Sequence, residues 1–232
     1  MINKFKLLTA TALFSLLSAC GGGGGGGGSA TTTVASTNTF DVNSGYRRLV
    51  STGFQKTFTL GGGCTGSLTI TAAPATTPAT FEGTNGLSGV SVSTMNLTNC
   101  TPASSSSTET RYYDTNYVPL GKSSNDEYTV HIGTPTLPSA ARVGDAGIAG
   151  SANTYTNNTK ATSTGRDDTS YAIEADTATT AILNLITKAY NTSGILTLTE
   201  QNRYRVAADG TLTFISFDLQ RSGTSTLRLT GN

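Results

Sequence analysis

Apolar and polar residues alternate along most of the chain from Phe40 onward, and turn residues interrupt this alternation at short intervals. Phe54, Phe58 and Leu60 share one face of such a segment, with Lys56 near its rim. Successive side chains of a strand point to opposite faces, so a spacing of two predicts half-buried strands. We therefore expect a mostly β fold, either an antiparallel sandwich or an open barrel.

The last quarter of the chain has the clearest strand pattern. Hairpin signals, each ending in Gly, separate four apolar segments, and consecutive strands joined by such turns form an antiparallel meander. Residues 177–190 also fit a helix with one apolar stripe, but their β-branched content favours a strand. The sequence thus predicts a C-terminal meander with strands at 181–189, 195–206, 212–219 and 225–229.

A boundary between two lobes is expected in the middle of the chain. Residues 133–168 are rich in Gly, Pro, Ser, Thr and Asn, which predicts long loops or weak hairpins. Loops of that length are unusual inside a compact domain. We expect an N-terminal β lobe over 40–121 and a C-terminal β lobe over 122–232.

The first residues have the layout of a signal peptide. Lys4 and Lys6 precede an apolar stretch over 7–17, and small residues follow it. The apolar stretch is about half the length that a membrane-spanning helix needs, roughly 20 residues. We therefore expect residues 1–19 to be removed on export.

The sequence Leu-Ser-Ala-Cys at 17–20 resembles the lipobox of bacterial lipoproteins. This resemblance implies cleavage before Cys20, a diacylglycerol thioether on its sulfur and acylation, as by palmitate, of its amine. Several long acyl chains, at about 0.8 kcal/mol per buried methylene, hold a protein on a membrane almost irreversibly. Since Gly21 rather than Asp follows the cysteine, the resemblance also implies sorting to the outer membrane of the cell envelope.

Residues 20–39 are expected to form a flexible, disordered stalk. Residues 21–28 are an unbroken run of glycines, followed by a Thr-rich stretch without apolar periodicity. Eight glycines have a mean reach of about 15 Å. The stalk would hold the folded part away from the lipid headgroups.

Charge excludes some classes of partner. The chain has 15 basic and 14 acidic residues, and two of the basic ones, Lys4 and Lys6, belong to the signal peptide. A balanced charge without a basic run indicates no nucleic-acid partner and no polybasic membrane contact. The predicted membrane attachment is therefore the lipid on Cys20.

Two cysteines remain after Cys20 is lipidated, namely Cys64 and Cys100. An exported chain folds in an oxidising compartment, where such a pair forms a disulfide by default. Closing a loop of this length stabilises the fold by roughly 3–4 kcal/mol in the chain-entropy model.

Candidate catalytic chemistry is sparse. His131 is the only histidine, which excludes three-histidine metal sites, and the chain has no Gly-x-Ser-x-Gly motif. His131 alternates with Tyr128, Val130 and Ile132, so we expect it on a solvated strand face. We therefore predict no catalytic residue and do not expect an enzyme.

The acidic residues gather at Asp167, Asp168, Glu174 and Asp176. Loops between strands offer carboxylate oxygens to calcium, which makes these four residues the calcium candidates and calcium the one cofactor considered. A solvated turn in which Arg166 pairs with the carboxylates is the favoured alternative.

Tyr112, Tyr113 and Tyr117 surround Asp114 and Asn116. A tyrosine ring supplies an apolar face and a hydroxyl, which suits a binding site for carbohydrate or peptide. The same residues are common in the core and rim of a β domain, so a structural role is the alternative.

These observations favour a membrane-anchored envelope or cell-surface lipoprotein that acts as a non-catalytic binding or adhesive module. A structural or assembly lipoprotein that docks to another envelope protein, by adding strands at exposed meander edges, is the alternative. A carboxylate-based hydrolase is a minor one.

Overall fold

A computed structural model describes residues 35–222 and 227–232. The expected signal peptide, the lipid site at Cys20 and the glycine run lie outside the described residues. In the part of the chain that is described, no helix has the length and apolar character needed to cross a membrane.

The described chain forms one helix and thirteen strands. Helix α1 spans Val42–Thr52. The strands are β1 (Phe54–Gly62), β2 (Gly66–Ala72), β3 (Thr77–Phe81), β4 (Thr84–Leu97), β5 (Ser104–Tyr113), β6 (Pro119–Ser124), β7 (Tyr128–Ile132), β8 (Ala146–Tyr155), β9 (Ser163–Ala175), β10 (Ala181–Asn191), β11 (Leu196–Val206), β12 (Leu212–Arg221) and β13 (Leu227–Gly231).

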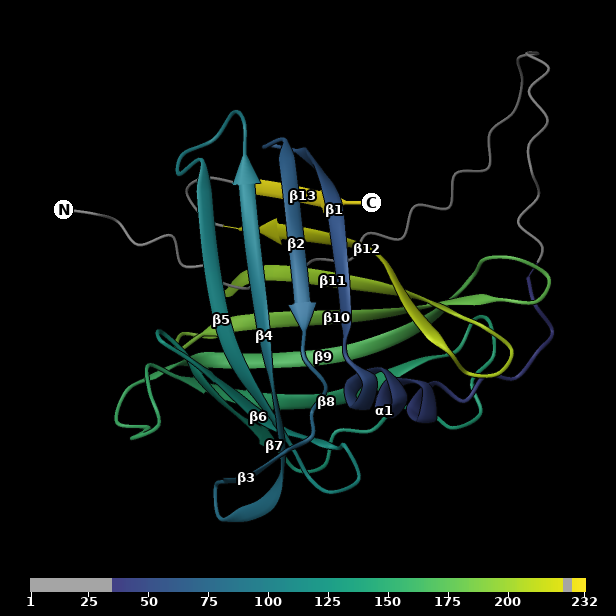
Figure 1. The fold of residues 1–232 in the computed structure, drawn as a ribbon, viewed down its shortest axis with the longest axis horizontal. Coiled ribbons are helices and arrows are strands. Elements are labelled where there is room, and N and C mark those ends of the chain that lie inside the picture. The colour runs from purple at the N-terminus through teal and green to yellow at the C-terminus, as the bar shows by residue number, and fades with distance from the viewer. Residues whose placement is uncertain (1–34, 223–226) are drawn as a thin grey trace.

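Twelve of these strands form a closed antiparallel barrel (Figure 1). From β4 to β13 each strand pairs with the next in the chain, β13 pairs with β1, and β1 pairs with β2. Pairing of β2 with β4 completes the circle, and β3 extends β4 as a hairpin. The predicted mostly β, antiparallel fold is confirmed, and the barrel is closed rather than open. Closure depends on pairing between distant segments, which no local pattern reveals.

The predicted C-terminal meander is confirmed. Strands β10, β11, β12 and β13 are consecutive neighbours in the sheet. The segment with two interpretations forms β10, in agreement with its β-branched content.

The expected boundary between two lobes falls inside β6, and strands on both sides of it belong to the same sheet. The segment 133–168 contains all of β8 and the start of β9, so only part of it is loop. Strand β8 was not expected because Gly and Ala replace large apolar residues at positions such as Gly147, Gly150 and Ala152. The Tyr171 ring packs over Gly147, whereas Gly150 and Ala152 border open space in the interior.

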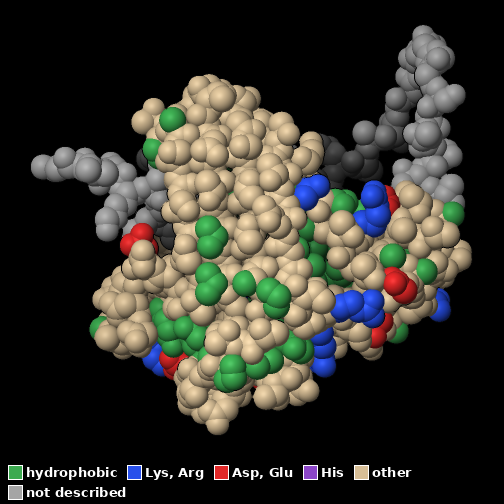
Figure 2. Space-filling model, viewed as in Figure 1, with side chains coloured by type: hydrophobic (Ala, Val, Ile, Leu, Met, Phe, Trp, Pro, Cys, Tyr) green, Lys and Arg blue, Asp and Glu red, His purple; other side chains and the backbone are tan. Residues whose placement is uncertain are grey.

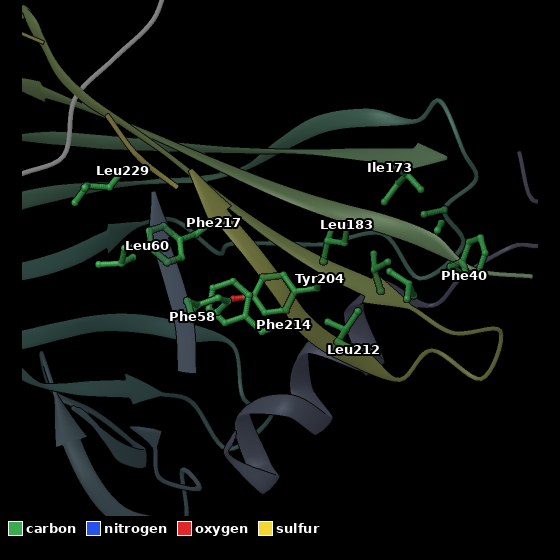
Figure 3. Packing of buried hydrophobic residues seen from close by; sticks show 14 of the residues in the cluster. Phe40, Phe58, Leu60, Ile173, Leu183, Tyr204, Leu212, Phe214, Phe217 and Leu229 are labelled. Atoms are coloured by element: carbon green, nitrogen blue, oxygen red, sulfur yellow. The ribbon is translucent and has the colours of Figure 1, made fainter. Parts of the chain in front are cut away.

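An apolar cluster fills one side of the barrel interior (Figure 3). Phe58 of β1 is fully buried and meets Phe214 and Phe217 of β12 edge-on, with ring centroids 4.9 and 5.1 Å apart. Tyr204 of β11 stacks on Phe214 at 4.7 Å. Burying each large apolar side chain stabilises the fold by about 1.5–3 kcal/mol. As predicted, Leu60 lies on the buried face with Phe58.

Helix α1 interrupts the strand pattern that we expected from residue 40 onward. Val42, Tyr46 and Leu49 are spaced as on one helix face, and the Asp41 side chain caps the helix by accepting from the Ser44 amide at 2.9 Å. Gly45 lets the helix approach the β11–β12 turn, because a Cβ there would lie 2.1 Å from the Gly210 oxygen.

Cys64 and Cys100 lie within disulfide-bonding distance, as predicted, with Cα atoms 5.7 Å apart. They belong to the β1–β2 and β4–β5 connections, which the pairing of β2 with β4 brings together. The bond joins two connections at one end of the barrel.

Candidate functional site

The barrel interior holds a cavity of about 400 Å³ that adjoins the apolar cluster, since Tyr204 belongs to both. Closed barrels of about eight strands are just wide enough to be filled by side chains, so a twelve-stranded barrel leaves room. The small residues of β8, Gly150 and Ala152, line this cavity. We refer to it as the lumen cavity.

Elements at one end of the barrel border the lumen cavity. Asn43 and Arg47 of α1 lie there, together with Tyr117 of the β5–β6 turn and residues 134–137 of the β7–β8 loop. The wall strands contribute polar side chains, because alternation on β5 to β9 and β11 directs charged residues inward. The polar groups on the wall are Arg111, Lys122, Thr129, His131, Asp167, Thr169, Thr187, Glu200 and Asn202.

The cations of the wall are paired with carboxylates. Arg111 lies 2.5 Å from Glu109, and Lys122 lies 2.9 Å from Glu127 and 3.7 Å from Glu109. Burial raises the pKa of Glu109, but the charges of Arg111 and Lys122 outweigh it and lower that pKa to about 2. These four groups form a neutralised network within the wall.

Asp167 differs from these carboxylates in its contacts. No hydrogen bond or ion pair joins its carboxyl group to another described residue, although it faces the lumen cavity. Burial, helped by the charges of Glu127, Glu200 and Asp168, raises the pKa of Asp167 to about 7 against the opposing charge of Lys122. Near neutral pH this carboxyl group therefore exchanges between its neutral and charged forms.

Glu200 lies on the same inner face, two strands from Asp167. Register aligns Thr169 of β9 with Thr187 of β10, and Thr187 with Glu200 of β11. Glu200 accepts a hydrogen bond from Asn202 at 2.5 Å and has no ion pair among the described residues. The cavity wall thus contains two carboxyl groups without a cationic partner.

His131 lies on the wall of the lumen cavity, so the expected solvated position is wrong. The alternation was predicted correctly, but the polar face of β7 turns inward and Ile132, on the other face, is 50% exposed. The His131 Nδ1 atom is buried without a hydrogen-bond partner. Burial, together with the charge of Lys122, lowers the pKa of His131, and the ring is neutral at neutral pH.

The three tyrosines proposed for ligand binding all lie along the lumen cavity, but register places the Tyr112 side chain on the outer face of the wall, in line with Gly121 and Val130. Tyr113 is 5% exposed. Tyr117 occupies the β5–β6 turn with a φ of 62°. Tyr112 also has a structural role, because its ring stacks on Phe81 at 4.4 Å.

The four calcium candidates do not form a cluster. Only Asp167 faces the lumen cavity, and its neighbour Asp168 points the other way, to Ser151 and Arg166 at 2.7 and 2.8 Å. Within the described ranges, no group of three or more His, Cys, Asp or Glu side chains is placed to hold a metal ion.

The other two calcium candidates are bound elsewhere. Glu174 accepts from Asn184 at 2.7 Å, and Asp176 accepts from Arg205 at 2.7 Å. The pairing with Arg166 that we considered as the alternative applies to Asp168. Strand alternation separates residues that are adjacent in sequence.

Sequence reasoning missed Lys122, Glu200, Tyr46 and Tyr204 as cavity residues. For β11 a signal was present, since Leu198, Glu200, Asn202, Tyr204 and Val206 share one parity. The apolar ends of that series mark the inner face, and its polar centre marks the place where the interior is hollow.

Comparison with protein-family models, with curated proteins and with solved structures finds no match to this chain. The lumen cavity, by its geometry and charge, is therefore the feature from which a function can be inferred.

Proposed function

We propose that this chain is a lipid-anchored envelope protein that binds a small ligand, without chemistry, in the lumen of its barrel. The observation that supports this proposal is the polar cavity of about 400 Å³ inside the closed barrel. Small-molecule sites range from about 300 to 1,000 Å³ and combine apolar walls with a few polar groups.

A purely structural interior would have a different composition. Protein cores are packed densely, and their buried polar groups are almost all paired. Here the Asp167 carboxyl group has no hydrogen bond or ion pair within the described ranges, although the charge of Lys122 acts on it, and His131 keeps a buried nitrogen unpaired. Groups of this kind carry a cost in stability, which a bound ligand offsets by supplying the missing partners.

The docking alternative required exposed edge strands in the meander. In the barrel both outer strands of the meander are paired, β10 with β9 and β13 with β1. Figure 2 shows few charged side chains on the wall of β2 and β4, and those two strands contain no charged residue. Ligand binding inside the barrel is therefore the function that the geometry supports best.

A variant that fills the cavity tests this proposal. Ala152 lies on the cavity wall and is 2% exposed, so Ala152→Phe places a ring in the space that a ligand would occupy. Asn153→Phe, one residue further along β8 and on the other face, is the matched control. A small-molecule library is screened by thermal shift with the full-length protein.

Compounds that raise the melting temperature of the wild type and of Asn153→Phe, but not of Ala152→Phe, would support binding in the lumen. Equal shifts in all three proteins would place the ligand elsewhere. If no compound shifts the wild type, the proposed function is wrong.

A carboxylate-based hydrolase is the second candidate, because Asp167 and Glu200 line the same cavity. Asp167, with a pKa of about 7, has the protonation behaviour of a general acid, and Glu200 is the second carboxylate. Release of nitrophenol from a panel of nitrophenyl glycosides, and its loss in both Asp167→Asn and Glu200→Gln, would favour this candidate over simple binding.

A further inference from the structure

The lumen cavity has a defined charge preference, and the inference drawn from it rests on the proposed function. We propose that it selects small molecules in which a protonated amine adjoins a flat apolar group. Asp167 and Glu200 receive the amine, and tyrosine rings cover the apolar part.

The charge balance of the interior supports a cationic ligand. Arg111 and Lys122 already have carboxylate partners, Glu109 and Glu127. At the border of the cavity Arg47 lies near Asp41. Burial is the largest single effect on the pKa of Asp41 and raises it, but hydrogen bonds from Ser44 and the charge of Arg47 together outweigh burial and lower that pKa. The carboxyl groups that remain unpaired in the interior therefore give it a negative excess, which attracts cations.

The position of the two acids leaves them free to contact a ligand. The Thr169 and Thr187 hydroxyls lie between them and bind each other, with 3.1 Å between the oxygens. Among the described residues no hydrogen bond joins either hydroxyl to Asp167, and the hydrogen bond that Glu200 accepts comes from Asn202. An ammonium group has three donors, so it can bind one of these carboxylates directly and still donate to a second acceptor.

The aromatic lining suits the rest of such a molecule. Burial raises the pKa of Tyr46 and of Tyr204, so both rings stay neutral and keep the negative potential of their faces. Stacking on Phe214 holds Tyr204 in place. Tyr204 lies on the inner face of β11 with Glu200, so a flat, neutral ring near an unpaired carboxylate provides an apolar surface and attracts a cation.

An anionic ligand is disfavoured by the same contacts. To bind it away from Arg47 at the border, Arg111 or Lys122 would have to leave a carboxylate partner, and that carboxylate would remain buried without a counter-charge. A neutral ligand would leave Asp167 and Glu200 as they are.

Three probes of one shape and different charge test this inference: phenethylamine, 2-phenylethanol and phenylacetate. Their affinities for the full-length protein are measured by isothermal titration calorimetry at pH 8, where Asp167 is ionised. We expect the amine to bind at least about tenfold more tightly than the alcohol, and phenylacetate to bind most weakly.

Neighbouring residues supply the matched variants. Asp167→Asn should weaken amine binding by about tenfold or more and leave the alcohol unchanged, whereas Asp167→Glu should retain the preference for the amine. Asp168→Asn removes the adjacent carboxylate on the opposite face and should leave all three affinities unchanged. Circular dichroism of each variant verifies the fold.

The outcomes separate the two proposals. If the alcohol or phenylacetate binds as tightly as the amine, or Asp167→Asn has no effect, the charge preference is wrong while binding in the lumen stands. If the wild type binds none of the probes at millimolar concentration, the preference is also wrong. The proposed function then depends on the library screen with Ala152→Phe.

Discussion

At the scale of single residues, Asp167 is the group whose ionisation opposes folding. Its pKa is about 7 in the folded protein and near 3.8, the ordinary value for an Asp side chain, in the unfolded chain. The folded chain therefore binds more protons than the unfolded chain between these values. This contribution to stability is fully present below pH 3.8 and is lost as the pH rises through about 7.

Replacing the carboxyl group gives a test with a defined sign. Asp167→Asn should increase the free energy of unfolding by about 1–2 kcal/mol at pH 8 and change it little at pH 4.5. Urea denaturation at both pH values measures the difference, with Asp168→Asn as control. A variant that is less stable than the wild type at pH 8 would contradict the assigned environment, which includes Lys122, Glu127 and Glu200.

Individual positions also show what the sequence determines. Alternation assigned Phe58 and Leu60 to a common buried face, and it separated His131 from Ile132. It could not say which face of β7 is the inner one, because a hollow interior admits polar side chains where a packed one excludes them. His131 was therefore placed outside although its parity was read correctly.

At the scale of elements, the β3–β4 hairpin is fixed to the barrel by aromatic packing. Phe81 stacks on Tyr112 at 4.4 Å and lies 5.2 Å from the ring of Tyr128. The Tyr128 hydroxyl donates to Glu82 at 2.7 Å, and Lys160 pairs with the same carboxylate. Through Tyr128 of β7 and Lys160 of the β8–β9 loop, the hairpin therefore contacts elements that are not its neighbours in the sheet.

A glycine makes this packing possible. A Cβ at Gly121 would lie 2.1 Å from the Thr129 oxygen and 2.6 Å from the Phe81 ring. Gly121→Ala should therefore destabilise the protein by about 1–3 kcal/mol. Gly61→Ala, where a Cβ meets only Thr230 at 3.6 Å, should change stability by less than about 0.5 kcal/mol. Equal denaturation midpoints for the two variants would contradict this packing.

Elements differ in how far the sequence reveals them. Strands β10 to β12 were found because Gly-containing turns separate long alternating segments. Strand β8 was missed because small residues hide its alternation. Helix α1 was missed because its three apolar positions were interpreted as part of a strand pattern, with a period of two.

At the scale of the whole molecule, the proposed attachment to a membrane is separate from the fold. Cys20 lies outside the described residues, so the lipid remains a proposal drawn from the lipobox resemblance. The barrel would be held on a chain of glycines, with its cavity free to meet ligands from solution.

Mass spectrometry tests the anchor directly. The wild-type protein should carry a diacylglyceryl mass at its processed N-terminus, and Cys20→Ser should lose that mass and leave the membrane fraction. Lipid retained on the serine variant would refute the assignment.

The whole barrel also shows the limit of sequence reasoning. The four meander strands are local and were predicted, whereas pairing of β1 with β13 and of β2 with β4 joins segments far apart in the chain. The lumen cavity exists only after these pairings form, so its residues could not be grouped beforehand. Only Tyr112, Tyr113, Tyr117, His131 and Asp167 were singled out for other reasons.

The pairing of β1 with β13 also has a consequence for the order of assembly (Figure 1). Strand β1 is synthesised early and its partner β13 late. The strands between them therefore form an open sheet until β1 and β13 pair. Contacts between such distant segments form slowly. The lumen cavity is complete only when this pairing has formed, so the proposed ligand binding would require a fully closed barrel.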